Sequence, residues 1–86
     1  MRDELRVAAT IENLRTISDF VREAGRRLRL TEDGWFDVDL AVEEAAANIV
    51  RHAYGPDRAG DIQVVTEILA DALRITLTDW GLPFRA

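Results

Sequence analysis

The sequence contains no cysteine and no long apolar run among its 86 residues. Without cysteine, neither a disulfide nor a thiolate-bound metal is available, and this composition favours the reducing cytoplasm. No apolar stretch approaches the roughly 20 residues that a membrane-spanning helix needs. The opening residues, Met1-Arg2-Asp3-Glu4, also lack the apolar segment of a signal peptide. We therefore expect a cytoplasmic protein that makes no membrane contact.

Basic residues are also scarce, because eleven Lys and Arg stand against sixteen Asp and Glu, for a net charge of −5. Tight binding to nucleic acid usually draws on a basic surface, so we expect no direct nucleic-acid partner. The one arginine cluster is interspersed with Glu23, Glu32 and Asp33, and we interpret it as a solvated face. Its members are Arg22, Arg26, Arg27 and Arg29.

The composition is otherwise that of a small globular domain, with 48% hydrophobic and 31% charged residues. A chain of this length buries only about 60–65% of its unfolded surface, so its stability margin is thin. No repeat, low-complexity tract or linker interrupts it. We therefore expect residues 1–86 to form a single domain.

The first half of the chain predicts a strand followed by a helix. Leu5–Ala9 alternates well enough for a strand, and either Thr10 or Asn13 can cap a helix that follows. Gly25 interrupts this helix at a cost of about 1 kcal/mol relative to alanine, and the sequence offers no reason for it. The apolar residues at helical spacing are Leu14, Ile17, Val21, Ala24 and Leu28.

A polar break over Thr31–Gly34 precedes a second predicted helix, which runs from about Asp37 to Tyr54. Its expected apolar stripe consists of Val38, Val42, Ala45, Ile49 and Ala53. A loop is expected at Gly55–Gly60. Two strands then follow, Asp61–Leu69 and Leu73–Thr78, which the short connection Ala70–Ala72 joins as a hairpin. This order predicts an α+β two-layer sandwich with both helices on one face of the sheet.

The second helix carries three different polar groups at steps of four residues: Glu44, Asn48 and His52. Residues four apart lie about 6 Å apart along one face of a helix. A carboxylate can act as a base, an amide oxygen can hold a hard cation, and an imidazole can contact phosphate. Alternatively, Glu44 and Asn48 are solvated residues without a task, and His52 interacts with the helix dipole. Glu43 points about 100° away from Glu44 and is expected to be solvated.

Asp79 and Gly81 form a second candidate motif, at the end of the last predicted strand. A fixed carboxylate can accept a hydrogen bond from an exocyclic amino group such as that of adenine, and glycine lets the backbone approach a flat ring. The alternative is a turn in which both residues merely end the strand. By itself an Asp-x-Gly segment is a weak signal, since chance supplies one in roughly a third of chains this long.

Taken together, the two motifs resemble one family. Glu44-x-x-x-Asn48-x-x-x-His52-x-Tyr54 on a helix, followed by a hairpin that ends in Asp79-x-Gly81-x-Pro-Phe, is similar to the GHKL or histidine-kinase-like ATPases. More narrowly, it resembles the bacterial anti-sigma-factor serine/threonine protein kinases. The resemblance covers nearly the whole chain. It implies a Bergerat-type ATP-binding fold, with a mixed, mostly antiparallel sheet and helices on one face.

The resemblance also implies roles for the motif residues, with ATP and Mg²⁺ as cofactors. Asn48 would be the magnesium ligand, Glu44 the general base, and His52 a contact at the ribose–phosphate side. Asp79 would bind the adenine amino group, and Gly81 would let the ring lie close. The implied partners are a sigma factor, which such a protein sequesters, and an anti-anti-sigma (STAS-type) protein whose serine it phosphorylates.

The sequence stops at Ala86, five residues after Gly81. Members of the family continue through an ATP lid and a second glycine-rich box, so we expect a fragment with weak or absent kinase activity. An open sheet edge would favour a homodimer. The alternative is a catalytically inactive binding module of the same fold. The ATP domain of a sensor histidine kinase ranks lower, because no phosphoacceptor-histidine helix precedes the motifs.

Overall fold

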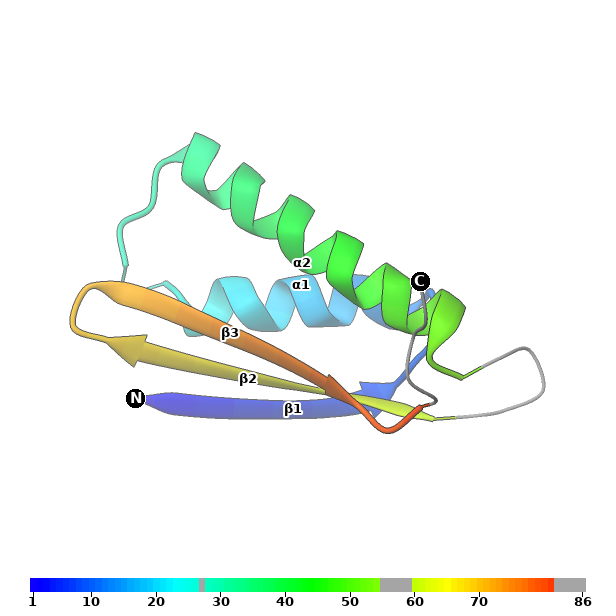
Figure 1. Ribbon diagram of the computed structural model, residues 1–86. Helices are drawn as coiled ribbons and strands as arrows, with labels where there is room; N and C mark the ends of the chain where they lie inside the picture. The colour runs from blue at the N-terminus through cyan, green and yellow to red at the C-terminus, as the bar shows by residue number, and fades with distance from the viewer. Residues whose placement is uncertain (27, 55–59, 82–86) are drawn as a thin grey trace.

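The fold has two layers, as the order of predicted elements indicated. The computed structural model describes residues 1–26, 28–54 and 60–81. Its elements are β1 (Arg2–Ala8), α1 (Asn13–Ala24), α2 (Glu32–His52), β2 (Asp61–Leu69) and β3 (Ala72–Asp79). Both helices lie on the same face of the sheet (Figure 1). The predicted α+β sandwich is therefore confirmed, and it is consistent with part of a Bergerat-type fold.

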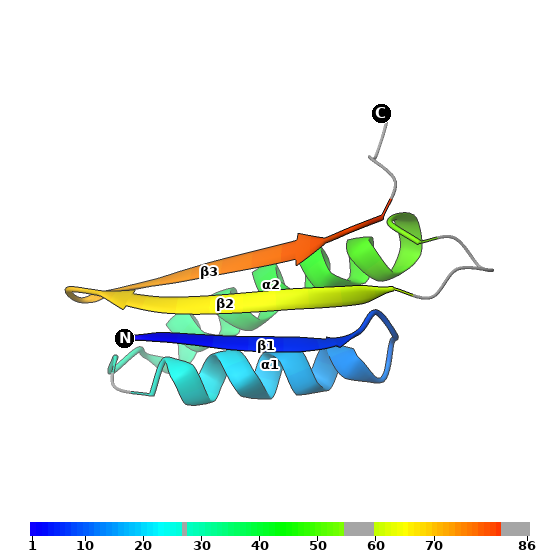
Figure 2. The same ribbon diagram turned by 90° about the horizontal axis from the view of Figure 1, so that it is seen from below.

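The sheet of the described residues has the order β1-β2-β3, and both pairings are antiparallel. Leu5 pairs with Val64, which in turn pairs with Leu77, and this row faces the helices. Figure 2 shows α1 running along β1, whereas α2 crosses behind β2 and β3. The parallel component of a mixed sheet is not seen among these strands. The β3 edge is unpaired within the part of the chain that the structure describes.

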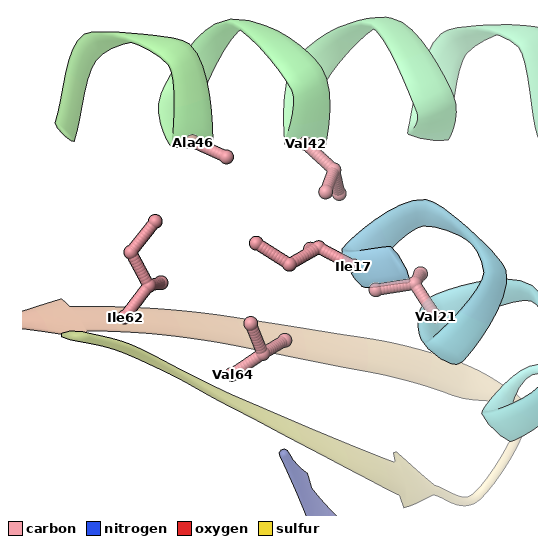
Figure 3. Packing of buried hydrophobic residues seen from close by; sticks show 6 residues of the cluster. All are labelled: Ile17, Val21, Val42, Ala46, Ile62 and Val64. Atoms are coloured by element: carbon pink, nitrogen blue, oxygen red, sulfur yellow. The ribbon is translucent and has the colours of Figure 1, made fainter. Parts of the chain in front are cut away.

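A small apolar core lies between the two layers. Its buried members come from α1, α2 and the central strand β2 (Figure 3). They are Ile17, Val21, Val42, Ala46, Ile62 and Val64. Because β2 is flanked on both sides and covered by both helices, it supplies the most buried strand residues. The helices and strands are thus fixed relative to one another by apolar contacts from three elements.

The first helix differs from its prediction at both ends. Neither proposed cap residue caps it: Glu12 is the N-cap, without a side-chain hydrogen bond. Asn13 is the first helical residue, and its side-chain amide donates to the backbone carbonyl of Ala8 at 2.8 Å. The helix ends at Ala24, four residues before the predicted Leu28. Gly25 closes it as the C-cap, with its amide donating to the carbonyl of Val21.

The structure also explains Gly25, for which the sequence offered no reason. A Cβ atom placed on this residue would lie 2.7 Å from Cη2 of Trp35 and 3.1 Å from a methyl group of Leu73. The first contact is an overlap and the second is tight, so the indole of α2 and the start of β3 occupy the space that a side chain would need. Gly25 therefore allows α1 to end against both layers of the molecule.

The second helix begins five residues earlier than predicted, so the expected polar break at Thr31–Gly34 is wrong. Thr31 is its N-cap, and its hydroxyl accepts a hydrogen bond from the amide of Gly34 at 3.0 Å. Such a bond satisfies an amide that the first helical turn leaves without a partner. One member of the expected stripe is also wrong, because Ala45 is exposed and Ala46 is buried in its place.

The hairpin is confirmed, with a connection of two residues, Ala70 and Asp71. Ala70 adopts a left-handed backbone conformation with φ of 55°, which matches the twist of a tight hairpin turn. The first strand is longer than predicted and starts at Arg2, which pairs with Glu67. Of the loop expected at Gly55–Gly60, residues 55–59 lie outside the described residues.

The arginine cluster is not only a solvated face. Arg22 donates to the carboxylate of Asp39 on α2, and its guanidinium lies 5.4 Å from the ring centroid of Trp35. The hydrogen bond with Asp39 raises the pKa of Arg22 above its ordinary value. Arg26 pairs with Glu23, whereas Arg27 lies outside the described residues. Within the described ranges, no helix combines the length and apolar character needed to cross a membrane.

Candidate functional site

The polar strip of α2 lies on the outside of the molecule. Glu44, Asn48 and His52 are all exposed, because the buried residues Val42 and Ala46 lie about 160° around the helix axis from Glu44. The strip therefore stays outside the core. Glu43 is exposed as well. The four-residue steps place the three polar side chains over about 12 Å of helix surface.

Asp79 is the last residue of β3 and lies on the face of the sheet that the helices cover. It pairs in register with Ile62, which is fully buried on that face. Its carboxylate oxygen Oδ1 accepts a hydrogen bond from the amide of Gly81 at 3.0 Å. Trp80 points to the opposite face, where its ring lies 4.2 Å beneath the guanidinium of Arg6. The Asp-x-Gly segment is therefore a strand-ending turn that also fixes one oxygen of the carboxylate.

Gly81 lies directly against the C-terminal end of α2. A Cβ atom on this residue would be 1.9 Å from the carbonyl oxygen of Ala53 and 2.7 Å from its Cβ. No side chain fits into that space, so the contact depends on glycine. Figure 1 shows the end of β3 lying below the last turn of α2. The fold thus brings the ends of the two motif-bearing segments together, at a point where residue 81 has no room for a side chain.

Tyr54 fastens this junction, and sequence reasoning assigned it no role. Its hydroxyl donates to the carbonyl of Asp61 at 2.7 Å and accepts from the amide of Trp80 at 2.9 Å. It is 7% exposed, so the two bonds hold the start of β2 and the turn after β3 to the helix end. The sequence offered one signal for this role, a tyrosine two residues after His52 at the end of the predicted helix. A tyrosine that becomes buried normally has hydrogen-bond partners for its hydroxyl.

A shallow groove of about 360 Å³ runs between α2 and β3. Its lining residues are Asp37, Val38, Ala41, Val42, Ala45, Ile75 and Leu77. Ala41 and Ala45 lie on the same side of α2 as Asn48 and His52, within about 60° of one another around the helix axis. This side of the helix therefore changes from apolar to polar towards the end that contacts Gly81. The apolar groove and the polar strip therefore adjoin each other along α2.

The described residues offer no all-protein metal cage, because no group of three or more His, Asp or Glu side chains is suitably placed. Asn48 provides one hard amide oxygen on the exposed strip. Magnesium is commonly held by one or two protein oxygens together with water and ligand phosphates. Among the described residues, the donor set fits an ion that arrives with a phosphorylated ligand and does not fit a resident structural metal.

Comparison with known proteins places the whole fold in one family. Residues 7–86 match the histidine kinase-like ATPase domain family. The chain is 32% identical over 81 residues to the serine-protein kinase RsbW of Bacillus mycoides (strain KBAB4), covering 94% of this chain and 50% of that protein. It is 35% identical over 82 residues to RsbW of Staphylococcus aureus (strain JH9), covering 94% and 52%. The chain therefore spans about half the length of the curated relatives it matches. It belongs to the histidine kinase-like ATPase domain family.

Proposed function

We propose that this chain binds ATP with Mg²⁺ and acts as an anti-sigma factor with serine-protein kinase activity towards an anti-anti-sigma (STAS-type) protein. The observation that carries the proposal is the junction of α2 with the Asp-x-Gly turn. Gly81 lies so close to the Ala53 carbonyl that a residue with a side chain could not take its place. The Tyr54 hydroxyl is hydrogen-bonded to the start of β2 and to the residue after β3. The segments that carry the two motifs therefore meet at the C-terminal end of α2.

Asp79 would recognise the adenine ring of the nucleotide. One carboxylate oxygen accepts from the amide of Gly81, and this bond fixes the direction of the second oxygen. A carboxylate accepts hydrogen bonds and cannot donate them when ionised, so it favours a base that presents an amino group. The bare backbone at Gly81 leaves room for a flat ring beside it. This geometry supports an adenine site and disfavours guanine, whose corresponding group is a carbonyl.

Asn48 and His52 would face the sugar and phosphate part of the same ligand. Both are exposed on the side of α2 that leads from the groove towards Gly81. Asn48 would supply the protein oxygen for Mg²⁺, which neutralises charge on the phosphates when bound. His52 would contact the ribose–phosphate end. Because both residues are on one rigid helix, their spacing is set before the ligand arrives.

Glu44 would act as the general base. It lies one turn before Asn48 on the exposed surface of α2, where a serine of another protein can reach it. Its carboxylate would orient the hydroxyl and take up its proton as phosphate is transferred. Phosphorylation adds nearly two negative charges to the serine, which is enough to break an interface by repulsion and desolvation.

The relatives are named serine-protein kinases, and this supports a protein serine as the acceptor. We propose that the partners are a sigma factor, sequestered by this chain, and a STAS-type protein that relieves the sequestration until it is phosphorylated. The proposed location is the cytoplasm. Self-association as a homodimer through the β3 edge is part of the same proposal, because that edge is unpaired among the described strands.

A second candidate is an interaction module that binds partners without catalysis. The unpaired edge of β3 lies beside an apolar groove, and a partner segment can use both without any nucleotide. Under this alternative, Glu44 and Asn48 would be exposed residues without a chemical task. The two functions differ in whether phosphate is transferred.

Phosphate transfer to a purified STAS-type protein, with ATP and Mg²⁺, tests the proposal. Glu44→Gln should lower the transfer rate by about 100-fold or more, because general-base catalysis contributes at least that much. Glu4→Gln is the control, since its side chain is also exposed but lies on the face of the sheet away from the helices. Partner binding without transfer by the wild type would favour the interaction module. Equal rates in both variants would contradict the role of Glu44.

A further inference from the structure

Two large apolar side chains are exposed on the outer surface of α2. Phe36 is 66% exposed and Leu40 is 47% exposed. They are four residues apart, and Leu40 is four residues before Glu44, so all three lie on one ridge of the helix. Around the helix axis, Leu40 lies about 40° and Phe36 about 80° from Glu44. The apolar pair is therefore continuous with the proposed catalytic carboxylate.

The fold itself does not need these side chains. The buried side of α2 is occupied by Val42 and Ala46, which pack on the core from the opposite side of the helix. Outward positions of a surface helix are ordinarily polar, and the neighbouring positions Asp33, Asp37 and Glu43 are exposed acids. Single exposed apolar residues are common, but an adjacent pair makes a contiguous patch. Phe36 and Leu40 form such a patch within an acidic surround.

The Phe36–Leu40 patch is close enough to Glu44 to be covered by a folded substrate protein. A stable complex buries about 800 Å² on each partner, equivalent to a disc of about 16 Å radius. Along the helix, Leu40 is about 6 Å and Phe36 about 12 Å from Glu44. A contact of this size that is centred on Glu44 would extend over both apolar residues. Aromatic side chains in the centre of such contacts contribute strongly to affinity.

We infer that the Phe36–Leu40 patch is a docking surface for the protein that carries the acceptor serine. This inference rests on the proposed function and names the surface that selects its substrate. The matching partner has an apolar patch flanked by basic side chains, because Asp33, Asp37 and Glu43 surround Phe36 and Leu40. When the partner's apolar patch covers Leu40, its acceptor serine lies about one turn of α2 further along, at Glu44. The patch selects the partner, whereas Glu44 acts on it.

The test compares the double variant F36S/L40S with the wild type in affinity and kinetics. The probes are purified STAS-type anti-anti-sigma proteins from the same organism, together with ATP and Mg²⁺. The double variant should raise both the Kd and the KM for its partner by at least tenfold, while kcat and ATP affinity stay unchanged. Leu69→Ser is the control, because Leu69 is 43% exposed on the sheet face away from the helices. It should leave all four quantities unchanged.

The possible results separate this inference from the function on which it depends. Unchanged partner affinity in F36S/L40S, with normal phosphate transfer by the wild type, would overturn the docking surface alone. Absence of wild-type binding to every STAS-type protein would overturn the proposed function and the docking surface together. Sedimentation of the chain alone provides a third outcome. A wild-type dimer that F36S/L40S converts to a monomer would assign the patch to self-association and overturn the inference.

Discussion

Two glycines set how closely the elements of this chain approach one another. Gly25 leaves room for the ring of Trp35, and Gly81 leaves room for the carbonyl of Ala53. In the sequence, Gly25 looks like a flaw in a helix, because glycine lowers helix stability. Its partners Trp35 and Leu73 lie 10 and 48 positions further along the chain. Local sequence patterns carry no information on contacts over such separations.

Gly25→Ala should destabilise the chain by about 1–3 kcal/mol, because the added methyl group overlaps the Trp35 ring. The backbone of Gly25 has φ of −89°, which alanine adopts without strain, so the cost comes from the contact alone. Urea unfolding followed by circular dichroism measures the change. Trp35→Leu should remove most of the added cost in a double-mutant cycle. Strictly additive effects of the two substitutions would contradict this explanation.

At the scale of elements, periodic patterns predicted each helix and strand and both ends of β2, but they missed ends of the other elements. The start of α2 was missed because Thr31 and Gly34 are residues typical of loops. In the structure the same pair forms the cap that starts the helix. The apolar stripe was displaced by one position, since Ala45 and Ala46 are the same residue type and only the packing distinguishes them. Residue type alone therefore gave the element and left its limits open.

Some features of the candidate site were predicted from the sequence and others were not. Glu44, Asn48 and His52 were predicted as one exposed strip, because helical spacing fixes their relative positions. The face of the sheet on which Asp79 lies was not predicted, and the register with Ile62 shows that it is the helix-facing side. Tyr54 was not predicted, because its two hydrogen-bond partners are backbone groups of other elements. Backbone partners have no signature in the sequence.

Tyr54→Phe should destabilise the chain by about 1–3 kcal/mol. The substitution leaves the Asp61 carbonyl and the Trp80 amide without the hydroxyl that joins them to α2. Hydrogen exchange should show faster opening at the amide of Trp80, while the centre of β2 keeps its protection relative to global unfolding. Unchanged stability and unchanged Trp80 exchange would show that the hydroxyl does not hold this junction.

At the scale of the whole molecule, one face of the sheet carries both helices, and the proposed ligand surface follows α2 along β3 (Figure 1). The groove, Asn48, His52 and the Asp-x-Gly turn succeed one another along this line. The apolar patch of Phe36 and Leu40 lies on the outer side of the same helix. A nucleotide and a protein substrate could therefore occupy neighbouring sides of α2, with Glu44 between them. The single helix would position both reactants.

Calorimetric titration of the chain with ATP and with GTP, in Mg²⁺ and in EDTA, tests the central claim most directly. The account predicts binding of ATP that strengthens with Mg²⁺, and a preference over GTP of at least about tenfold, because a carboxylate accepts from an amino group. Asn48→Ala should abolish the effect of Mg²⁺, and Asp79→Asn should reduce the preference for ATP. Equal affinity for both nucleotides, or no ATP binding with or without Mg²⁺, would contradict the account.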